Sequence, residues 1–169
     1  MLLAIFDFDY TISDDNTDTS YWPLLDQTFY KSQYEKFQNS NGRGPDNHEF
    51  TWHMLCNSFM RSIDYQTLIR TIENIKLVPG IVDLLKKIKE KDSNNKIIIV
   101  SDSNTEFIKK ILEKNEISYL IDEVHTNGFD VEKVEITNYE VAFKIWFGLI
   151  LVFFLTCFFI SYQDLLMKQ

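Results

Sequence analysis

The sequence predicts an α/β fold with a Rossmann-like, doubly wound parallel sheet, and three observations lead to this prediction. Residues 2–6 form a short, nearly all-apolar run, and "KIIIV" at residues 96–100 forms a second one. Both runs end in polar residues, and amphipathic helical patterns lie between and after them. Short apolar runs of this kind are typical of parallel strands with both faces covered. Strands alternating with helices in this order indicate a doubly wound domain.

Length and charge narrow the class of protein further. A chain of 169 residues is long enough for one core, or for one core with a small insertion. The net charge of -8 argues against a nucleic-acid binder, because phosphate backbones require a basic surface. The two cysteines, Cys56 and Cys157, lie too far apart to indicate a zinc site or a disulfide framework. We therefore expect a cytoplasmic protein, and the first residues read as a strand rather than a signal peptide.

The first strand and the segment that follows it differ sharply in composition. After the strand, residues 13–77 interleave aromatic and apolar residues with polar ones, as in "YWPLLDQTFYKSQYEKF" and "HEFTWHMLCNSFMRSI". This pattern indicates short helices, separated by the turn-rich stretch "NSNGRGPDN". We therefore expect a helical cap at 13–77, inserted into an α/β core formed by residues 1–12 and 78–139.

From Pro79 onward the pattern becomes regular. Pro79 and Gly80 precede "IVDLLKKIKEK", in which Ile81, Leu84, Leu85 and Ile88 mark one helical face. The second strand, "KIIIVSDSN", comes next.

The segment "SNTEFIKKILEKN" then predicts another helix. Ser103 and Glu106 match a capping box. The buried side of this helix is expected to carry Phe107, Ile108, Ile111 and Leu112. A third strand is expected over Asp122–Thr126.

The end of the chain departs from this pattern. Residues 145–163 contain no charged residue, and "IWFGLILVFFLTCFFI" is apolar almost throughout. Such a stretch is a candidate membrane-spanning helix, although it lies near the lower limit of length. The alternative is a hydrophobic core helix or a pair of strands. We therefore predict a hydrophobic C-terminal helix within residues 140–169, with membrane contact through 145–163 as one alternative.

Acidic and hydroxyl side chains follow both predicted core strands. Asp7 and Asp9 follow the first strand, and Ser101 and Asp102 end the second. In open parallel sheets, functional groups collect beyond the carboxyl ends of the strands. If the two strands are neighbours, these four residues converge.

This set of residues suits chemistry on phosphate esters. Asp7 is a candidate nucleophile toward phosphorus, and Asp9 a candidate proton donor. A carboxylate and a phosphate repel each other, so we expect Mg²⁺ as the cofactor. Thr11 and Ser101 offer hydroxyl groups to phosphate oxygens.

Two motifs carry a resemblance to a known family. The segment "DFDYT" resembles the DxDxT motif of the haloacid dehalogenase superfamily, and "IIIVSDSN" is similar to its second motif. The longer segments "DFDYTISDDNTDT" and "KIIIVSDSNTEFI" resemble one branch, the phosphoethanolamine/phosphocholine phosphatases and pyridoxal phosphate phosphatases. The similarity covers roughly residues 1–139 and is weak across the cap. It implies a Mg²⁺-dependent phosphatase of small phosphomonoesters.

The resemblance also implies roles for individual residues. By this carry-over Asp7 is the nucleophile and a Mg²⁺ ligand, and Asp9 is the proton donor and a second ligand through its carbonyl. Ser101 matches the phosphate-binding serine of the family. Asp18 and Asp102 match positions that contact the substrate in this branch.

The sequence departs from the family after the third strand. The family places a Lys in a third motif and a GDxxND-like acidic motif after another strand, and nothing similar follows Asp130. Two alternatives to an active phosphatase therefore remain. One is a catalytically impaired, truncated phosphatase-like protein, with or without a membrane anchor. The other is a small module that binds phosphate or Mg²⁺ without turnover.

Overall fold

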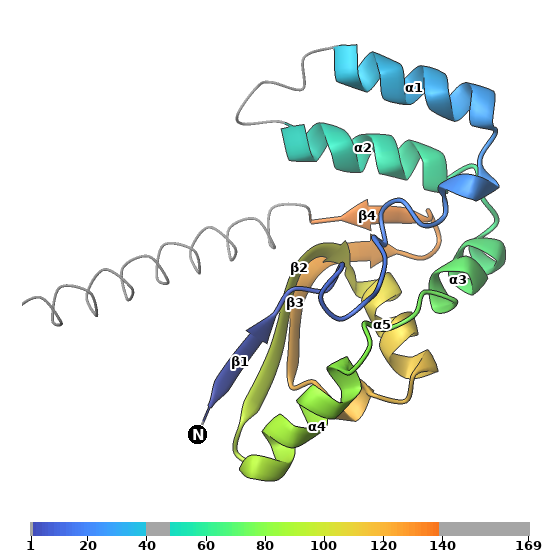
Figure 1. Cartoon of the computed structure of the whole chain (residues 1–169). Helices are drawn as coiled ribbons and strands as arrows, with labels where there is room; N and C mark the ends of the chain where they lie inside the picture. The colour runs from blue at the N-terminus through green and yellow to red at the C-terminus, as the bar shows by residue number, and fades with distance from the viewer. Residues whose placement is uncertain (1, 40–47, 139–169) are drawn as a thin grey trace, which may run out of the picture.

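The computed structural model describes residues 2–39 and 48–138 of the chain (Figure 1). The predicted hydrophobic helix at 140–169 lies outside these residues. No helix within the described part combines the length and apolarity that crossing a bilayer needs.

The core is a four-stranded mixed sheet with the strand order β1-β2-β3-β4. Strand β1 (Leu3–Phe6) pairs in parallel with β2 (Lys96–Asn104), and β2 pairs in parallel with β3 (Glu123–Asp130). Strand β4 (Glu135–Thr137) is antiparallel to β3. The α/β, Rossmann-like prediction is therefore confirmed, and so is the adjacency of the first two strands.

The third strand is longer than predicted. It begins at Glu123 and continues to Asp130, where the sequence predicts its end near Thr126. The additional residues form a hairpin with β4, which the sequence analysis did not anticipate. Its turn includes Val134 at a φ of 52°, a left-handed conformation in a residue without any local sequence signal for it. A three-residue strand with one buried side chain, Ile136, carries too little pattern to predict.

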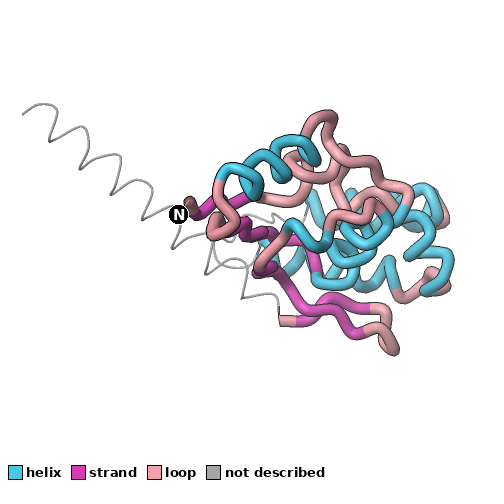
Figure 2. Tube along the Cα trace, turned by 90° about the horizontal axis from the view of Figure 1, so that it is seen from below, coloured by secondary structure: helices cyan, strands magenta, loops and turns pink. Residues whose placement is uncertain are grey.

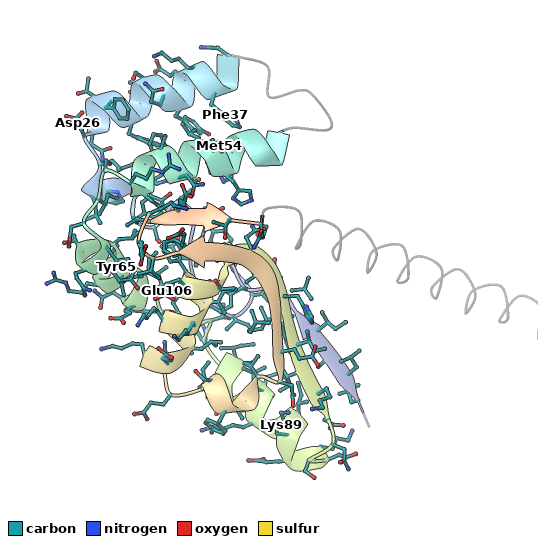
Figure 3. All side chains as sticks on the ribbon, turned by 180° about the vertical axis from the view of Figure 1, so that it is seen from behind. Asp26, Phe37, Met54, Tyr65, Lys89 and Glu106 are labelled. Atoms are coloured by element: carbon teal, nitrogen blue, oxygen red, sulfur yellow. The ribbon has the colours of Figure 1, made fainter. Side chains whose placement is uncertain are left out.

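The two crossover helices lie on the same side of the sheet (Figures 1 and 3). Helix α4 (Ile81–Lys91) precedes β2, and α5 (Thr105–Lys114) connects β2 to β3. As the periodicity predicts, α5 buries Phe107, Ile108, Ile111 and Leu112. Helix α4 buries Ile81 and Leu85, whereas Leu84 is exposed. A short 3₁₀ turn (Ser118–Leu120) leads from α5 toward β3.

The predicted capping box at the start of α5 is wrong. The N-cap is Asn104, whose side chain accepts a hydrogen bond from the Phe107 N–H at 3.0 Å. Strand β2 continues through Ser103, and the hydroxyl of this residue contacts Thr17 instead of the helix. An asparagine is as good an N-cap as a serine, so the helix starts one residue later than the capping box suggests.

The insertion between β1 and α4 is helical, as predicted. It contains a 3₁₀ turn (Trp22–Leu24), α1 (Gln27–Asn39), α2 (His48–Met60) and α3 (Tyr65–Glu73). Helices α1 and α2 lie side by side at the end of the sheet where β4 lies (Figure 1).

Aromatic side chains form the interior between α1 and α2. The ring of Trp22 lies 4.6 Å from that of Tyr30 and 5.5 Å from that of Trp52, measured between centroids. Phe59 packs edge-on against Trp22 and contributes a fully buried side chain. Offset and edge-on contacts of this kind stabilise a small helical unit that has little aliphatic core.

Helix α3 packs against α5 rather than against α1. The Tyr65 hydroxyl donates a hydrogen bond to the Glu106 carboxylate, and the two labelled side chains point toward one another in Figure 3. Leu68, Ile69 and Ile72 of α3 are buried. Although α3 follows α1 and α2 directly in the sequence, it therefore packs against a helix of the core instead.

The outer edge of the sheet is formed by β1. Leu3 and Ile5 are 55% and 41% exposed, while Ala4 and Phe6 pack against the hydrophobic core. Viewed from below, the described helices all lie to one side of the strands (Figure 2). Asp7 directly follows this edge strand.

Candidate active site

The carboxylate of Asp7 lies where β1 ends, next to the tip of β2. Its Oδ1 accepts a hydrogen bond from the Phe8 N–H at 2.6 Å. Burial raises the pKa of Asp7, while the Phe8 N–H and the Ser101 hydroxyl, which also hydrogen-bonds it, act in the opposite direction. These donors favour the charged form of a partly desolvated carboxylate. Asp7 thus lies close enough to Ser101 for the hydroxyl to lower the pKa of the carboxyl group.

A tight loop turns the chain back immediately after Asp7. The Phe8 carbonyl accepts hydrogen bonds from the N–H groups of Thr11, Ile12 and Ser13 at 3.2, 2.8 and 3.0 Å. Tyr10 has a φ of 56° in this loop. Because three amides converge on one carbonyl, the loop holds Asp9 on the same side as Asp7.

The carboxylate of Asp9 is held by one residue of the next loop. Thr17 donates its N–H to Asp9 Oδ1 at 3.2 Å and its hydroxyl to Asp9 Oδ2 at 3.1 Å. The pKa of Asp9 is raised to about 7, mainly by burial and also by the charges of Asp102 and Asp7, while the hydrogen bonds from Thr17 lower it. Asp9 is therefore able to exist in both protonation states near neutral pH.

The tip of β2 supplies the remaining polar groups. Ser101 is fully buried, and its Oγ accepts a hydrogen bond from the Ser103 N–H at 3.2 Å. Asp102 is exposed, and its charge raises the pKa of both Asp7 and Asp9. The structure thus brings together the four predicted residues that follow the two strands.

The other two predicted site residues are placed differently. Thr11 is half-buried and belongs to the loop around the Phe8 carbonyl, so its role as a phosphate contact stays a prediction. Asp18 is buried and turned toward helix α2, where its Oδ2 accepts a hydrogen bond from Trp52 Nε1 at 3.3 Å. Its expected contact with the substrate also stays a prediction.

Several buried polar residues near this site were missed by the sequence analysis. Thr17 and Ser103 are both fully buried, and their hydroxyl oxygens lie 2.6 Å apart. On β3, Asn127 donates a hydrogen bond to the Asp102 carbonyl, and its Nδ2 lies 3.5 Å from Nε2 of His53. The three consecutive polar residues "NTD" at positions 16–18 were the local sequence feature that could have pointed to Thr17, and such a run also fits a solvated turn.

Polar residues four apart on α2, and Arg61 directly after its end, face the β3–β4 hairpin. His53 lies beside Asn127, Asn57 exchanges hydrogen bonds with the Ile136 backbone, and Arg61 forms an ion pair with Glu135. Residues at this spacing share one face of a helix. Hydrogen bonds and an ion pair therefore hold α2 against the β3–β4 hairpin.

The donor set near the strand tips fits a hard divalent cation. The charge of Asp102 raises the pKa of Asp7 and of Asp9, and the charge of Asp7 also raises the pKa of Asp9, which is the electrostatic condition that a bound cation relieves. Within residues 2–39 and 48–138, no group of three or more His, Cys, Asp or Glu residues is arranged to hold a metal ion. Mg²⁺ commonly uses one or two carboxylates and completes its shell with water and substrate phosphate oxygens.

Comparison with known proteins matches most of the chain to one family. Residues 2–140 match the model of the Putative Phosphatase family. A protein named "Probable phosphatase phospho2" from Xenopus tropicalis is 33% identical over 142 residues, covering 82% of this chain and 58% of that one. The human "Pyridoxal phosphate phosphatase PHOSPHO2" is 31% identical over 126 residues, covering 75% of this chain and 51% of that one. The chain thus spans about half the length of these relatives.

Solved structures agree on the fold. A HAD family hydrolase from Salmonella enterica serovar Typhi superposes with a TM-score of 0.58 at 16% identity, covering 80% of this chain and 43% of that one. A phosphoserine phosphatase structure described as a phospho-aspartyl intermediate analogue gives 0.57 at 19% identity, covering 80% and 60%. Together with the family match, these findings show that the chain belongs to the Putative Phosphatase family and has the fold of haloacid dehalogenase-type hydrolases.

Proposed function

We propose that this protein is a Mg²⁺-dependent phosphomonoester hydrolase that acts on a small metabolite such as pyridoxal phosphate, phosphoethanolamine or phosphocholine. One observation carries the proposal. Asp7, hydrogen-bonded to Ser101, lies at the same strand tips as Asp9, a second carboxyl group with a pKa near neutrality. A charged nucleophile beside a protonated acid is the arrangement that two-step phosphate-ester hydrolysis requires.

The first step forms an aspartyl-phosphate on Asp7. A carboxylate oxygen of Asp7 attacks phosphorus, and the bond between phosphorus and the ester oxygen breaks with its electron pair on that oxygen. Asp9 gives its proton to the departing oxygen, so the alcohol leaves neutral. Ser101 supports this step because its hydrogen bond favours the charged form of Asp7.

The second step returns the enzyme to its starting state. A water molecule attacks phosphorus, its proton passes to the Asp9 carboxylate, and Asp7 is released as a carboxylate with inorganic phosphate. Asp9 thus acts as acid in the first step and as base in the second, for which a pKa of about 7 is well matched.

The metal ligands we propose are the Asp7 carboxylate and the Asp9 carbonyl. A bound Mg²⁺ supplies charge compensation that allows the anionic ester to approach the carboxylate. Thr11, Ser101 and the backbone amides of the loop are proposed phosphate contacts. Asp18 and Asp102 are proposed contacts of the remainder of the substrate.

The experiment is a phosphate-release assay on the full chain with Mg²⁺ and the three named substrates. Asp7→Asn is the test variant, and Asp14→Asn, an exposed acid in the following loop, is the matched control. We expect turnover in the wild type and in the control and none above background in Asp7→Asn. Equal turnover in all three proteins contradicts the assignment of Asp7.

The same protein samples distinguish the alternative without turnover. Calorimetry with Mg²⁺ and beryllofluoride, which mimics a phosphoryl group on a carboxylate, reports binding independently of catalysis. Binding without phosphate release identifies the catalytically impaired protein. Release that is lost on chelation of Mg²⁺ and restored on its return supports the enzyme.

We also propose a cytoplasmic location, with a membrane anchor at residues 145–163 as the alternative. The proposal is supported by the cysteine usage. Fractionation of cells decides between the two. Recovery in the soluble fraction supports the cytoplasmic location, and retention in membranes after a carbonate wash supports the anchor.

A further inference from the structure

Both oxygens of the Asp9 carboxyl group are bound by the same residue. The Thr17 N–H reaches Oδ1 at 3.2 Å, and the Thr17 hydroxyl reaches Oδ2 at 3.1 Å. The Ser13 hydroxyl also lies 3.5 Å from Oδ1. Because two donors at different points hold the two oxygens, the plane of the carboxyl group is fixed as well as its position.

The hydroxyl of Thr17 is itself held from the neighbouring strand. Thr17 Oγ1 and Ser103 Oγ lie 2.6 Å apart, and neither residue is exposed to solvent. Ser103 is fixed in turn, because Thr126 on β3 donates its hydroxyl to the Ser103 carbonyl at 2.7 Å. A buried hydroxyl with such partners is costly to reorient, so the pair holds Asp9 to the tip of β2.

The two oxygens of Asp9 have chemically different partners. An N–H group can only donate, so the Thr17 amide requires Oδ1 to remain an acceptor. The hydroxyl of Thr17, 3.1 Å from Oδ2, can both donate and accept. With Thr17 donating to Asp9, the Ser103 hydroxyl is the donor to Thr17.

We propose that Thr17 is a positioning residue that fixes the orientation of the Asp9 carboxyl group, with Ser103 orienting the Thr17 hydroxyl. This inference rests on the proposed function, in which Asp9 protonates the leaving oxygen. Thr17 contacts neither the reacting phosphorus nor the leaving group in this scheme. Its effect is on the direction from which Asp9 delivers the proton.

Substitution of Thr17 separates the two contacts. Thr17→Val removes the hydroxyl and keeps the N–H and the shape of the side chain, whereas Thr17→Ser keeps the hydroxyl. Thr19→Val is the matched control, because Thr19 lies in the same loop and its hydroxyl, 3.4 Å from the Asn16 carbonyl, makes no contact with Asp9 among the hydrogen bonds of the described residues. Ser103→Ala tests the second hydroxyl of the pair.

The choice of substrate reports on proton delivery rather than on folding. An alkyl phosphate has a poor leaving group that needs a proton to depart. The p-nitrophenolate group of p-nitrophenyl phosphate departs readily without one. We expect Thr17→Val to lower kcat about 10- to 100-fold with phosphoethanolamine, less than about threefold with p-nitrophenyl phosphate, and to leave KM within about twofold. Thr17→Ser should restore most of the activity, and Ser103→Ala should show a smaller loss of the same kind.

Two results overturn the inference even if the enzyme is active. An equal loss with both substrates assigns Thr17 a structural role, and unchanged kcat values in Thr17→Val show that the hydroxyl is dispensable. An active wild type in either case leaves the proposed function standing.

A second measurement tests the contact without turnover. In protein labelled with ¹³C at aspartate carboxyl groups, the Asp9 signal is identified by its loss in Asp9→Asn. We expect Thr17→Val to move this signal and Thr19→Val to leave it in place. An unmoved Asp9 signal in Thr17→Val refutes the positioning role, whereas an inactive wild type with a moved signal refutes only the proposed function.

Discussion

Asn57 of helix α2 and Ile136 of strand β4 are joined by two hydrogen bonds. Asn57 Nδ2 donates to the Ile136 carbonyl at 3.1 Å, and the Ile136 N–H donates to Asn57 Oδ1 at 2.6 Å. The side-chain amide thus pairs with β4 as a neighbouring strand does. Both residues are buried, so these hydrogen bonds join α2 and the sheet away from solvent.

Replacement of this amide should destabilise the protein. In Asn57→Ala the N–H and C=O groups of Ile136 lose their partners in a buried place, which we expect to cost about 2 kcal/mol. Urea unfolding measures the loss, with Asn94→Ala as the control because the hydrogen bonds of this exposed residue to Asp92 stay within its own turn. Equal stability of the two variants contradicts the role of Asn57 in holding the cap.

Removal of the Ser101 hydroxyl should change the pH dependence of catalysis. The hydrogen bond from Ser101 lowers the pKa of Asp7 against the effect of burial. In Ser101→Ala that pKa rises, so a smaller fraction of Asp7 is charged at a given pH. We expect kcat/KM to fall by about tenfold or more and the acid limb of its pH profile to move to higher pH.

The control for this prediction is Ser58→Ala. Ser58 is exposed on α2, and its hydroxyl donates only to the Leu55 carbonyl. A pH profile of Ser101→Ala that is lower but not displaced refutes the electrostatic effect on Asp7 and leaves a loss of phosphate contact as the cause.

Asp9 should make the metal-free protein less stable as the pH rises. Its pKa is about 7 in the folded state, against an ordinary value of 3.8, so the folded protein keeps a proton that the unfolded chain releases. The proton held by Asp9 therefore contributes to the stability of the folded state below about pH 4, and this contribution is lost between about pH 4 and 7. Asp9→Asn lacks this group, so its stability relative to wild type should improve over this window by on the order of 1–3 kcal/mol.

Unfolding in the presence of a chelator, at both ends of this pH window, measures the effect. Asparagine keeps an acceptor for the Thr17 N–H and a donor toward the Thr17 hydroxyl, so the variant is expected to fold. Asp14→Asn serves as the exposed control. A difference between Asp9→Asn and wild type that is the same at both pH values contradicts the prediction.

Asp122 should contribute stability with the opposite pH dependence. Its carboxylate accepts hydrogen bonds from Lys89, the Ile97 N–H and Lys96, and the Lys89 bond is the main cause of its lowered pKa. This contribution is present above the ordinary aspartate pKa of about 4 and is lost as the pH falls below it. We expect Asp122→Asn to lower the melting temperature at neutral pH.

The difference between Asp122→Asn and wild type should shrink on acidification to roughly pH 2. Asp83→Asn, in the first turn of α4, is the control. A difference that persists unchanged in acid shows that packing, not charge, accounts for the effect.

Local patterns were sufficient for most of the core elements. The apolar runs of β1 and β2 and the periodicity of α4 and α5 reflect burial that depends on residue spacing within one element. The convergence of Asp7 and Ser101 was also predictable, because adjacent parallel strands bring their carboxyl ends to one edge. What failed was the start of α5, where Ser103 and Asn104 are equally plausible caps by sequence.

The sequence alone determined which chemical groups stand at the ends of β1 and β2, because strand polarity and residue order decide which side chains follow each strand. Only the tertiary structure decided the partners of those groups. Thr17 and Ser103 are 86 residues apart in the sequence, and Asn57 and Ile136 are 79 residues apart. Local sequence patterns do not relate residues at such distances. Hydrogen bonds between buried side chains depend on how whole elements pack, and their energies are decided by desolvation that no short segment of sequence reveals.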